Sequence, residues 1–522
     1  MGTIANRQSA TNVLELARSA HDIVIVGGGI YGAMLHLEAS RAGLRSLLVE
    51  RGDFGGATSE NSLRIVHGGL RYLQNLNVAR SVESTRERQW YLESMPRLVT
   101  PLPCLLPIYE RGRKRTSVLS LGLAANDAIS AAIMYLDCAV DVPRGHVLDA
   151  RATLELAPAI PADGLVGGAV WHDLSLRCPG RVIVEALKWA ADFGGVAVNY
   201  VEARRLLTTR GRVRGISVGE PGGHTIAELK ADVVVNAAGP WAGALASRWG
   251  AADDRLSPLV VAWNVLLDRP PLSGHAVALQ DPSSSDAPLK FATSLGDRLL
   301  VGTGYAALSG SCESAEAVAE SELGAFLSAL NRCVPGLDAS RRDVLRVFSG
   351  VLPAAAPASS VPRARNLLSA RGPHGLFTVS GTKFTTARSA ARRALAAVRR
   401  AGLLRWPTMA PQAYPPCHAS ASEGLFGPEW TMQDVERRRP WLAQIVAIEA
   451  VEHLDDLVLR RTTLGDQPVR ALTAARALCS LDDRWQREAE REIARLAAQL
   501  GWRQAARAMN RPGHDGRAAM TA

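Results

Sequence analysis

Several features that mark special classes of protein are scarce or missing in this 522-residue sequence. Aromatic residues make up only 5%, so the core must consist mainly of aliphatic side chains. The seven cysteines are scattered without a Cys-x-x-Cys pair, which argues against a zinc site or a disulfide framework and favours a reducing compartment. The longest apolar stretch, 118–136, is interrupted by Asn126 and Asp127, and the first 20 residues lack a secretory signal pattern. These absences predict a cytoplasmic protein, with attachment to the inner membrane surface left open.

The remaining composition is that of a large globular protein. Hydrophobic residues make up 47% and charged residues 21%, which is enough to bury a sizeable core. The formal charge of +10 favours negatively charged partners such as phosphates, anionic cofactors or lipid headgroups. A basic cluster at 111–115 could contact anionic lipid or form a solvated loop. No basic stripe interleaved with aromatic residues is present, so nucleic-acid binding is not predicted.

A glycine-rich turn follows the first apolar run of the chain. The run Ile23–Val26 suits a strand buried on both faces, and the turn at 27–32 fits G-x-G-x-x-G through Gly27, Gly29 and Gly32. A helix is predicted at 33–42, and a second strand at 46–49 ends at Glu50. Glycines allow a pyrophosphate to approach the backbone at a helix N-terminus. Glu50 can accept hydrogen bonds from free ribose hydroxyls and would repel a 2′-phosphate, so the pattern favours the adenosine of FAD or NAD.

Further motifs carry a resemblance to a known family. A-T-S-E-N-S at 57–62 is followed by H-G-G-L-R-Y-L at 67–73. N-A-A-G-P-W occurs at 236–241, G-T-K-F-T-T-A-R at 381–388, and D-D-L-V-L-R-R-T at 455–462. Together these segments resemble FAD-dependent glycerol-3-phosphate dehydrogenases of the respiratory, quinone-reducing type. The sequence is that of a divergent member, because other motifs of the family are altered.

The resemblance implies an α/β fold with three parts. These are a Rossmann-like FAD domain of the glutathione-reductase type, a substrate domain with an antiparallel sheet, and a C-terminal α-helical domain. Short strand patterns between 255 and 305 agree with such a sheet. The predicted divisions are a lead at 1–20, an oxidoreductase region at 21–404, a linker at 405–430, a helical domain at 431–505 and a disordered tail at 506–522. Within the oxidoreductase region, FAD-binding segments are expected at about 21–80, 145–250 and 345–404, and substrate-domain segments at about 81–144 and 251–344.

The resemblance also implies hydride transfer from an alcohol carbon to FAD, which needs a base and cationic groups around the substrate. Arg71 is expected to contact a substrate anion, with Tyr72 beside it, unless they serve as a surface ion-pair partner and a core residue. Lys383 is expected near the flavin and substrate. His67 either transfers a proton or holds the loop over the flavin. The residues expected to contact FAD are Gly27, Gly29, Gly32, Glu50, Thr58, Ser59, Ser62, Ala237, Gly239, Trp241, Gly381, Thr382, Lys383 and Thr385. No metal site is predicted.

The substrate side departs from the family pattern. The K-G-S-H stretch, which supplies the family's proposed base, reads V-A-W-N here and ends at Asn264, whose amide does not titrate. The arginine of G-V-R-P-L is Leu352, and G-T-T-D reads G-T-G-Y at 302–305. Trp263 adds apolar surface, either for a larger substrate or for core packing. These changes predict retained FAD binding with a different, less phosphate-dependent substrate.

Three functions follow from these patterns. The leading one is an FAD-dependent oxidoreductase acting on a small alcohol-type substrate. The alternatives are a true glycerol-3-phosphate dehydrogenase, forming dihydroxyacetone phosphate with a quinone acceptor, and a non-catalytic flavin-binding interaction protein. The predicted partners are a small-molecule substrate and an electron acceptor, a quinone or another. The oligomeric state stays open, as does the role of Trp171-His172-Asp173, which could reach the pocket or hold a structural histidine.

Overall fold

The computed structural model of the chain describes residues 10–69, 77–110, 122–125, 127–129, 142–281, 288–308, 318–407, 411–417 and 430–501. The basic cluster at 111–115, most of the predicted linker and the predicted tail lie outside these ranges.

The first of two sheets is mainly parallel, with the strand order β16-β17-β10-β1-β2-β7 and with β9 and β8 added beside β10. Its central strand β1 is buried on both faces from Ile23 onwards, as the apolar run predicts. In the parallel register Val26 lies beside both Asn236 and Val49, so neighbouring strands end at one common edge. The bounds are β1 Ala20–Val26, β2 Ser46–Val49, β7 Val196–Val198, β8 Glu202–Thr209, β9 Arg212–Gly219, β10 Thr225–Asn236, β16 Leu367–Ser369 and β17 Leu376–Ser380.

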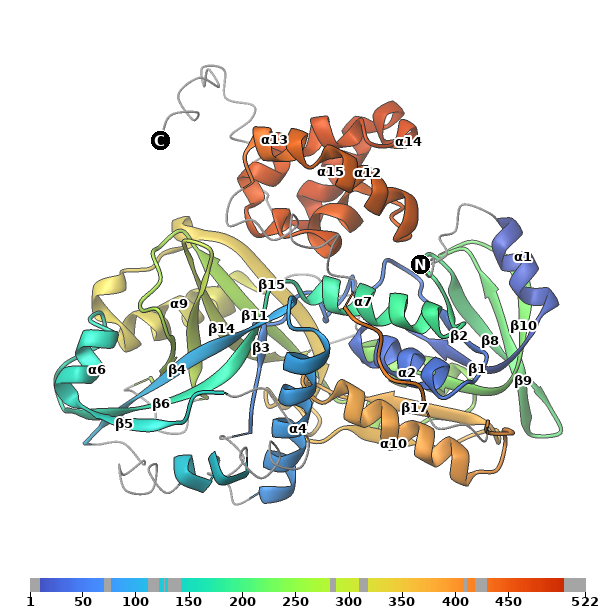
Figure 1. The fold of residues 1–522 in the computed structure, drawn as a ribbon, viewed down its shortest axis with the longest axis horizontal. Coiled ribbons are helices and arrows are strands. Elements are labelled where there is room, and N and C mark those ends of the chain that lie inside the picture. Colours follow the sequence, from blue (N-terminus) through green and yellow to red (C-terminus); the bar gives the residue numbers. More distant parts are fainter. Residues whose placement is uncertain are drawn as a thin grey trace.

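Helices cover one face of this sheet, and a hairpin with two short helices covers the other (Figure 1). The first group is α2 Ile30–Arg41, α7 Pro179–Asp192 and α10 Ala387–Arg400, with α4 Val78–Ser94 at its edge. The second group is α1 Ala10–Arg18, the β8–β9 hairpin and α8 Ala242–Arg248. In α10 four of the six alanines are buried while most arginines stay exposed, so the helix packs through its small face.

The second sheet has the order β15-β11-β14-β13-β12-β4-β6-β3, and β5 pairs with β6. Its pairs are antiparallel except β12 with β4. Helix α9 packs on one face, and α6 lies beside β5 and β6. The bounds are β3 Ile65–Val66, β4 Val99–Tyr109, β5 His146–Asp149, β6 Leu165–Leu176, β11 Leu259–Leu267, β12 Ala276–Leu279, β13 Lys290–Leu295, β14 Arg298–Ala307, β15 Val344–Pro353, α6 Ala150–Leu156 and α9 Glu320–Cys333.

Sheet membership differs from the expected segment boundaries in three places. The segments 21–80, 145–250 and 345–404 are predicted to belong to FAD binding, yet β3, β5, β6 and most of β15 pair in the second sheet. Strand patterns in a sequence show that a strand exists but not which distant strand it pairs with. The full division into domains stays a prediction.

The C-terminal helices form a separate unit above the junction of the two sheets (Figure 1). Its core is built from its own apolar residues around Trp485 and Val451. The bounds are α11 Met432–Arg437, α12 Arg439–Ile448, α13 Pro468–Cys479, α14 Asp483–Arg487 and α15 Ala489–Gln499, with a π-helical turn η8 Asp456–Arg461. The remaining short turns are η1 Gly239–Trp241, η2 Asp254–Leu256, η4 Pro335–Leu337, η5 Arg341–Asp343 and η9 Leu464–Asp466. The predicted α/β class, with a parallel sheet, an antiparallel sheet and a helical unit, is confirmed. Across the described ranges, no helix combines the length and apolarity needed to cross a membrane.

Candidate active site

A cavity of about 1520 Å³ lies where the carboxyl ends of the parallel strands meet the second sheet. This edge is where open α/β sheets usually bind ligands. The turns after β1, β2, β10 and β17 line one side, and β11, β14 and β15 line the other. Of the residues predicted for the site, the lining includes Gly27, Gly29, Glu50, Thr58, Ser59, Ser62, His67, Ala237, Gly239, Trp241, Gly381, Thr382, Lys383 and Thr385.

The glycine turn after β1 has no space for side chains. Gly27 has a φ of +109°, and a Cβ there would lie 2.6 Å from the carbonyl oxygen of Ala237. Gly32 is absent from the lining because it packs beneath the turn, where a Cβ would lie 1.8 Å from the Gly27 oxygen. Both positions therefore require glycine, which leaves the backbone and the N-terminus of α2 bare toward the cavity.

Glu50 stands at the end of β2 and lines the cavity. Its two carboxylate oxygens accept the N–H groups of Gly28 at 2.6 Å and Gly52 at 2.7 Å. Burial raises the pKa of Glu50, and these two hydrogen bonds oppose the rise. Each oxygen keeps a second lone pair, so the carboxylate can still accept hydroxyl groups from the cavity. Beside it, the Arg51 guanidinium lies 4.1 Å from the centre of the Trp241 ring.

The loop containing A-T-S-E-N-S joins the two halves of the cavity. The Thr58 hydroxyl donates to the carbonyl oxygen of Val351 on β15 at 2.8 Å. The Ser59 hydroxyl accepts the N–H of Ile30 at 3.1 Å, which ties the loop to the N-terminus of α2. The loop therefore lies between the glycine turn and the second sheet, where it lines the cavity from the predicted cofactor side to the predicted substrate side.

The turn after β17 is held by Tyr31 from α2. The Tyr31 hydroxyl lies 3.0 Å from the carbonyl oxygen of Lys383 and accepts the Lys383 N–H at 3.2 Å. A Cβ at Gly381 would lie 2.1 Å from this hydroxyl, so only glycine fits. Burial raises the pKa of Tyr31 to about 12, which keeps its hydroxyl protonated at neutral pH. On the far side of the turn, Thr385 accepts the backbone N–H of His67 at 3.2 Å.

His67 forms a pair with a buried carboxylate. Its Nδ1 lies 3.2 Å from Asp173 Oδ2, and Asp173 Oδ1 accepts the N–H of Gly68 at 2.6 Å. Burial opposes ionisation of Asp173, but the contact with His67, the hydrogen bond from Gly68 and the Arg88 charge outweigh it, so the pKa of Asp173 lies below its ordinary value. An ionised carboxylate can only accept, so Nδ1 carries the proton here, and in the neutral imidazole Nε2 carries the lone pair. The imidazole is about half exposed and lines the cavity.

Asp173 is a functional candidate that the sequence alone does not single out. It lies on β6, in the Trp171-His172-Asp173 pattern, which reaches the site through its acid rather than its histidine. The Trp171 indole N–H also points to Asp173, at 3.3 Å. The pairing of β3 with β6 brings this pattern beside His67, and no local signal predicts that contact.

On the substrate side, Asn264 is fixed by two hydrogen bonds. Its Nδ2 donates to the carbonyl oxygen of Asn61 at 2.9 Å, and its Oδ1 accepts the Thr303 hydroxyl at 2.9 Å. Leu352 lines the cavity where the family pattern has arginine. The predicted substrate contacts Arg71 and Tyr72 lie outside the described residues. In the ranges that the structure describes, no three acidic, histidine or cysteine side chains are grouped as a metal site would need.

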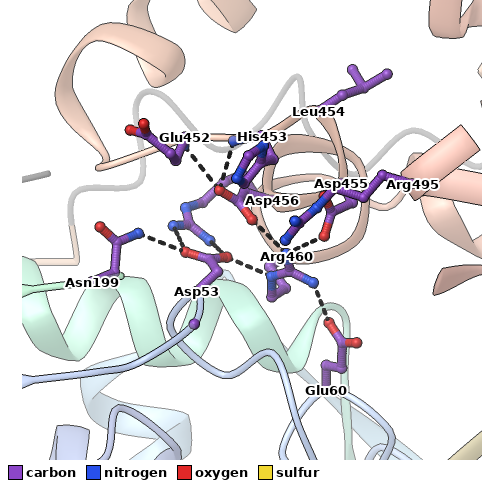
Figure 2. A network of polar contacts seen from close by, with 12 residues as sticks. Asp53, Glu60, Asn199, Glu452, His453, Leu454, Asp455, Asp456, Arg460 and Arg495 are labelled. Carbon is purple, nitrogen blue, oxygen red and sulfur yellow. Dashed lines mark hydrogen bonds and ion pairs between the residues drawn. The ribbon is translucent and has the colours of Figure 1, made fainter. Parts of the chain in front are cut away.

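The helical unit contacts the segment 53–60, which includes part of the A-T-S-E-N-S loop, through the buried charges shown in Figure 2. The Arg460 guanidinium reaches Glu60 at 3.1 Å, Asp455 at 2.9 Å and Asp456 at 2.6 Å, and it also contacts Asp53. Arg461 holds both oxygens of Asp53, at 2.7 and 2.8 Å. Asp53 and Glu60 flank Thr58 and Ser59 in sequence, so this network anchors the loop at both ends.

The charges of this network shift its acids in opposite directions. Burial opposes ionisation of Asp53, but Arg461 and Arg460 outweigh it and lower its pKa to about 2. Burial, together with Asp53 and Asp455, raises the pKa of Asp456 to about 6. Two arginines therefore stabilise the charge of one acid more than that of its neighbour, which is the usual outcome when buried carboxylates share cations.

The lining fits a flavin dinucleotide. A bare glycine turn and a buried carboxylate at one end suit a pyrophosphate and a ribose. The tightly held turn 381–385 and His67 lie at the other end, next to the second sheet. The volume exceeds the roughly 300–1,000 Å³ of pockets for drug-sized ligands, so a dinucleotide and a small substrate can occupy it together.

Comparisons with known proteins agree with this geometry. The sequence profile of the family described as FAD dependent oxidoreductase, abbreviated DAO, matches residues 22–397. The aerobic glycerol-3-phosphate dehydrogenase of Staphylococcus saprophyticus is 30% identical over 376 residues, which span 71% of this chain and 65% of that protein. The match therefore leaves about a third of the relative's length uncovered.

Two solved structures share the fold. Glycerol-3-phosphate dehydrogenase from Bacillus halodurans, complexed with FAD, superposes with a TM-score of 0.66 at 22% identity, covering 92% of this chain and 95% of its own. L-α-glycerophosphate oxidase from Mycoplasma pneumoniae, with FAD bound, has a TM-score of 0.56 at 17% identity, covering 76% and 98%. The predicted FAD cofactor is thereby confirmed, while the individual residue contacts to it stay predictions. The chain belongs to the DAO family of FAD-dependent oxidoreductases and resembles its glycerol-3-phosphate dehydrogenases.

Proposed function

We propose that the protein oxidises a small alcohol-type substrate other than glycerol 3-phosphate, in a cavity where FAD accepts the hydride. The flavin supplies the redox chemistry when it is bound. The chain must supply a base for the hydroxyl proton, a fixed position for the reacting carbon, and a lining that excludes water.

The His67–Asp173 pair is the observation that carries this proposal. Its protonated Nδ1 faces an ionised carboxylate, so Nε2 is left to accept a proton from a substrate hydroxyl in the cavity. Asp173 fixes the tautomer and stabilises the imidazolium that forms. The hydrogen bond from the His67 backbone to Thr385 keeps the pair beside the turn that is expected to contact the flavin. A base of this kind compensates for Asn264, which cannot take a proton.

The altered positions argue against glycerol 3-phosphate. Hydrogen bonds between a charged group and a phosphate contribute about 1.5–3 kcal/mol each. The two lost cations are the family's lysine, replaced by Val261, and its arginine, replaced by Leu352. Losing both weakens phosphate binding by roughly two to four powers of ten. Lys383, together with Arg71 and Tyr72 if they lie as the resemblance implies, would hold the remaining polar groups of the substrate.

The alternative is a true glycerol-3-phosphate dehydrogenase that forms dihydroxyacetone phosphate and reduces a quinone. The similarity to the aerobic glycerol-3-phosphate dehydrogenase of Staphylococcus saprophyticus favours it. In either case the electron acceptor, the cytoplasmic location and the contact with a membrane surface stay predictions.

The test is anaerobic bleaching of the purified yellow protein. Small alcohols, hydroxy acids, amines and glycerol 3-phosphate are added separately, and loss of the flavin absorbance is followed over time. We expect bleaching by at least one alcohol-type compound and none by glycerol 3-phosphate at millimolar concentration. Rapid bleaching by glycerol 3-phosphate would establish the alternative, and bleaching by no compound would leave only the non-catalytic flavin-binding protein.

A further inference from the structure

The cavity continues to the space between the second sheet and α9. The lining there includes Trp263 on β11, Lys290 on β13 and Tyr305 on β14, with Phe326 and Glu322 from α9. None of the family motifs named above contains Lys290. The ligand that this part of the cavity binds is therefore not indicated by those motifs.

Lys290 is a largely buried lysine that lines the cavity. Only 9% of the Lys290 surface is exposed. Among the described residues its ammonium has no hydrogen bond and no ion pair. The ammonium faces the Phe326 ring, whose centre lies 5.7 Å from Nζ. The nearby acid Asp281 is paired with Arg332 at 2.6 Å, and Glu322 is an exposed residue of α9. Burying an ammonium without a partner is costly, so this position favours an anionic ligand.

A second donor lines the same part of the cavity. The indole N–H of Trp263 is buried, and within the described ranges it donates to no acceptor. The indole also borders Phe326, with ring centres 6.3 Å apart. A buried donor without an acceptor can take a ligand oxygen, so the Trp263 N–H beside the Lys290 ammonium and the Phe326 ring indicates a site for ligand oxygens.

The position of the indole depends on Gly304. Trp263 pairs with Gly304 across β11 and β14. A Cβ at Gly304 would lie 2.3 Å from the indole Cε2 and 2.5 Å from Nε1, so any other residue would displace the ring. The pair of Trp263 and Gly304 is thus built as a unit, because the large side chain uses the space that glycine leaves.

Lysine is also rare in this chain, which strengthens the case for Lys290. Only five of the 60 Lys and Arg residues are lysines. Two of those five, Lys290 and Lys383, line the cavity. A compact ammonium is therefore kept at two places where a substrate can approach, in a protein that otherwise uses arginine.

We infer that Lys290 and Trp263 form a subsite for a carboxylate carried on an apolar substrate body. One positive charge and one neutral N–H match a monoanion, whereas a phosphate dianion needs more positive charge. Phe326 and the indole provide apolar walls for the rest of the molecule. The inference rests on the proposed function and makes it more specific: the substrate is an alcohol that also bears a carboxylate.

The test is calorimetric titration of the FAD-loaded protein, which does not depend on turnover. Phenylacetate is the carboxylate probe, phenylacetamide is its neutral counterpart, and inorganic phosphate is the competing anion. We expect phenylacetate to bind and Lys290→Met to weaken it about 10- to 100-fold, as loss of a charged hydrogen bond does, with little change for phenylacetamide. Trp263→Phe keeps the ring and should weaken phenylacetate about 2- to 10-fold.

Lys230→Met is the matched control, since Lys230 is an exposed lysine of β10 away from the cavity. It should leave all three affinities unchanged. Equal phenylacetate affinity in Lys290→Met and wild type, no phenylacetate binding at all, or tighter binding of phosphate than of phenylacetate would each overturn the subsite. If Lys290→Met loses its flavin or fails to fold, Lys290→Gln and Trp263→Phe are used for the same comparison. If phenylacetate binds but no compound bleaches the flavin, the subsite stands and the proposed function is refuted. If an alcohol bleaches the flavin but phenylacetate does not bind, the proposed function stands and the subsite is refuted.

Discussion

Arg460 is predicted to stabilise both the docking of the helical unit and the loop that lines the cofactor cavity. Its guanidinium contacts four carboxylates, on Asp53, Glu60, Asp455 and Asp456. The perturbation is Arg460→Leu, which keeps an apolar stem in the same space. It removes the Arg460 contacts to both ends of the segment 53–60.

The expected loss follows from what the remaining residues can compensate. Arg461 still holds Asp53, and Arg495 still reaches Asp455 at 2.6 Å. Glu60, which is 7% exposed, has no second cation among the ion pairs of the described residues. Removing one partner of a buried pair costs about 3–5 kcal/mol. That is a large share of the roughly 5–15 kcal/mol by which a typical protein is stable.

Urea unfolding and flavin retention measure the effect. We expect the unfolding midpoint of Arg460→Leu to fall, and FAD to dissociate at lower urea concentration, because Thr58 and Ser59 lie between the two anchored acids. Arg460→Lys keeps the charge but cannot reach four acids, so its unfolding midpoint should lie between those of wild type and Arg460→Leu. The matched control is Arg476→Leu in the same helical unit, where an exposed pair with Glu490 contributes about 0–1 kcal/mol. If Arg460→Leu unfolds and releases FAD at the same urea concentration as Arg476→Leu, the network does not hold the loop.

Three further outcomes test the site. His67→Gln should keep its FAD and slow anaerobic flavin bleaching about 10²- to 10⁴-fold, as loss of a general base does; unchanged bleaching would remove His67 from the mechanism. Gly32→Ala should yield colourless protein in absorbance spectra, because its Cβ would lie 1.8 Å from the Gly27 oxygen; a yellow, folded variant would contradict this. The pKa of Asp456 is raised to about 6 in the folded protein, so the folded state binds a proton more tightly there than the unfolded state. The stability that this proton binding contributes is present at low pH and is lost as the pH rises from about 4 to about 6. Asp456→Asn should therefore become more stable relative to wild type over that window in thermal unfolding, and a difference that does not change with pH would refute the assignment.

The front of the fold is predictable because its signals are local. The apolar run Ile23–Val26, the glycines of the next turn and Glu50 lie within one short segment, and each has a separate physical reason for its residue type. The strand β11, Leu259–Leu267, lies within 255–305, where short strands are predicted for the same reason. Short-range periodicity and turn residues are sufficient where the partner elements follow directly in sequence.

Other parts depend on contacts between distant residues. Asp173 lies 106 residues from His67, and Arg460 lies 407 residues from Asp53. Nothing local indicates that these charges are buried and paired, because charged side chains usually face solvent. Strand β4 is hidden in the sequence by Pro101, Pro103 and Pro107, a residue type that is depleted in sheets. β4 pairs with β6 along its whole length, whereas β12 pairs with only two of its residues. The prolines are tolerated because, among the described residues, most of the other edge of β4 has no partner strand.

The departures on the substrate side depend on one another. Asn264 lies directly over Gly302, where a Cβ would come within 1.8 Å of its Oδ1, and its amide is held from both ends. Trp263, the next residue, has its indole over Gly304. Any side chain at 302 would displace the Asn264 amide, and a larger residue at 304 would displace the indole. Random loss of function would leave voids at such positions, whereas here each replacement is packed against a glycine of β14. The packing therefore favours a pocket remodelled for another substrate over one that has decayed.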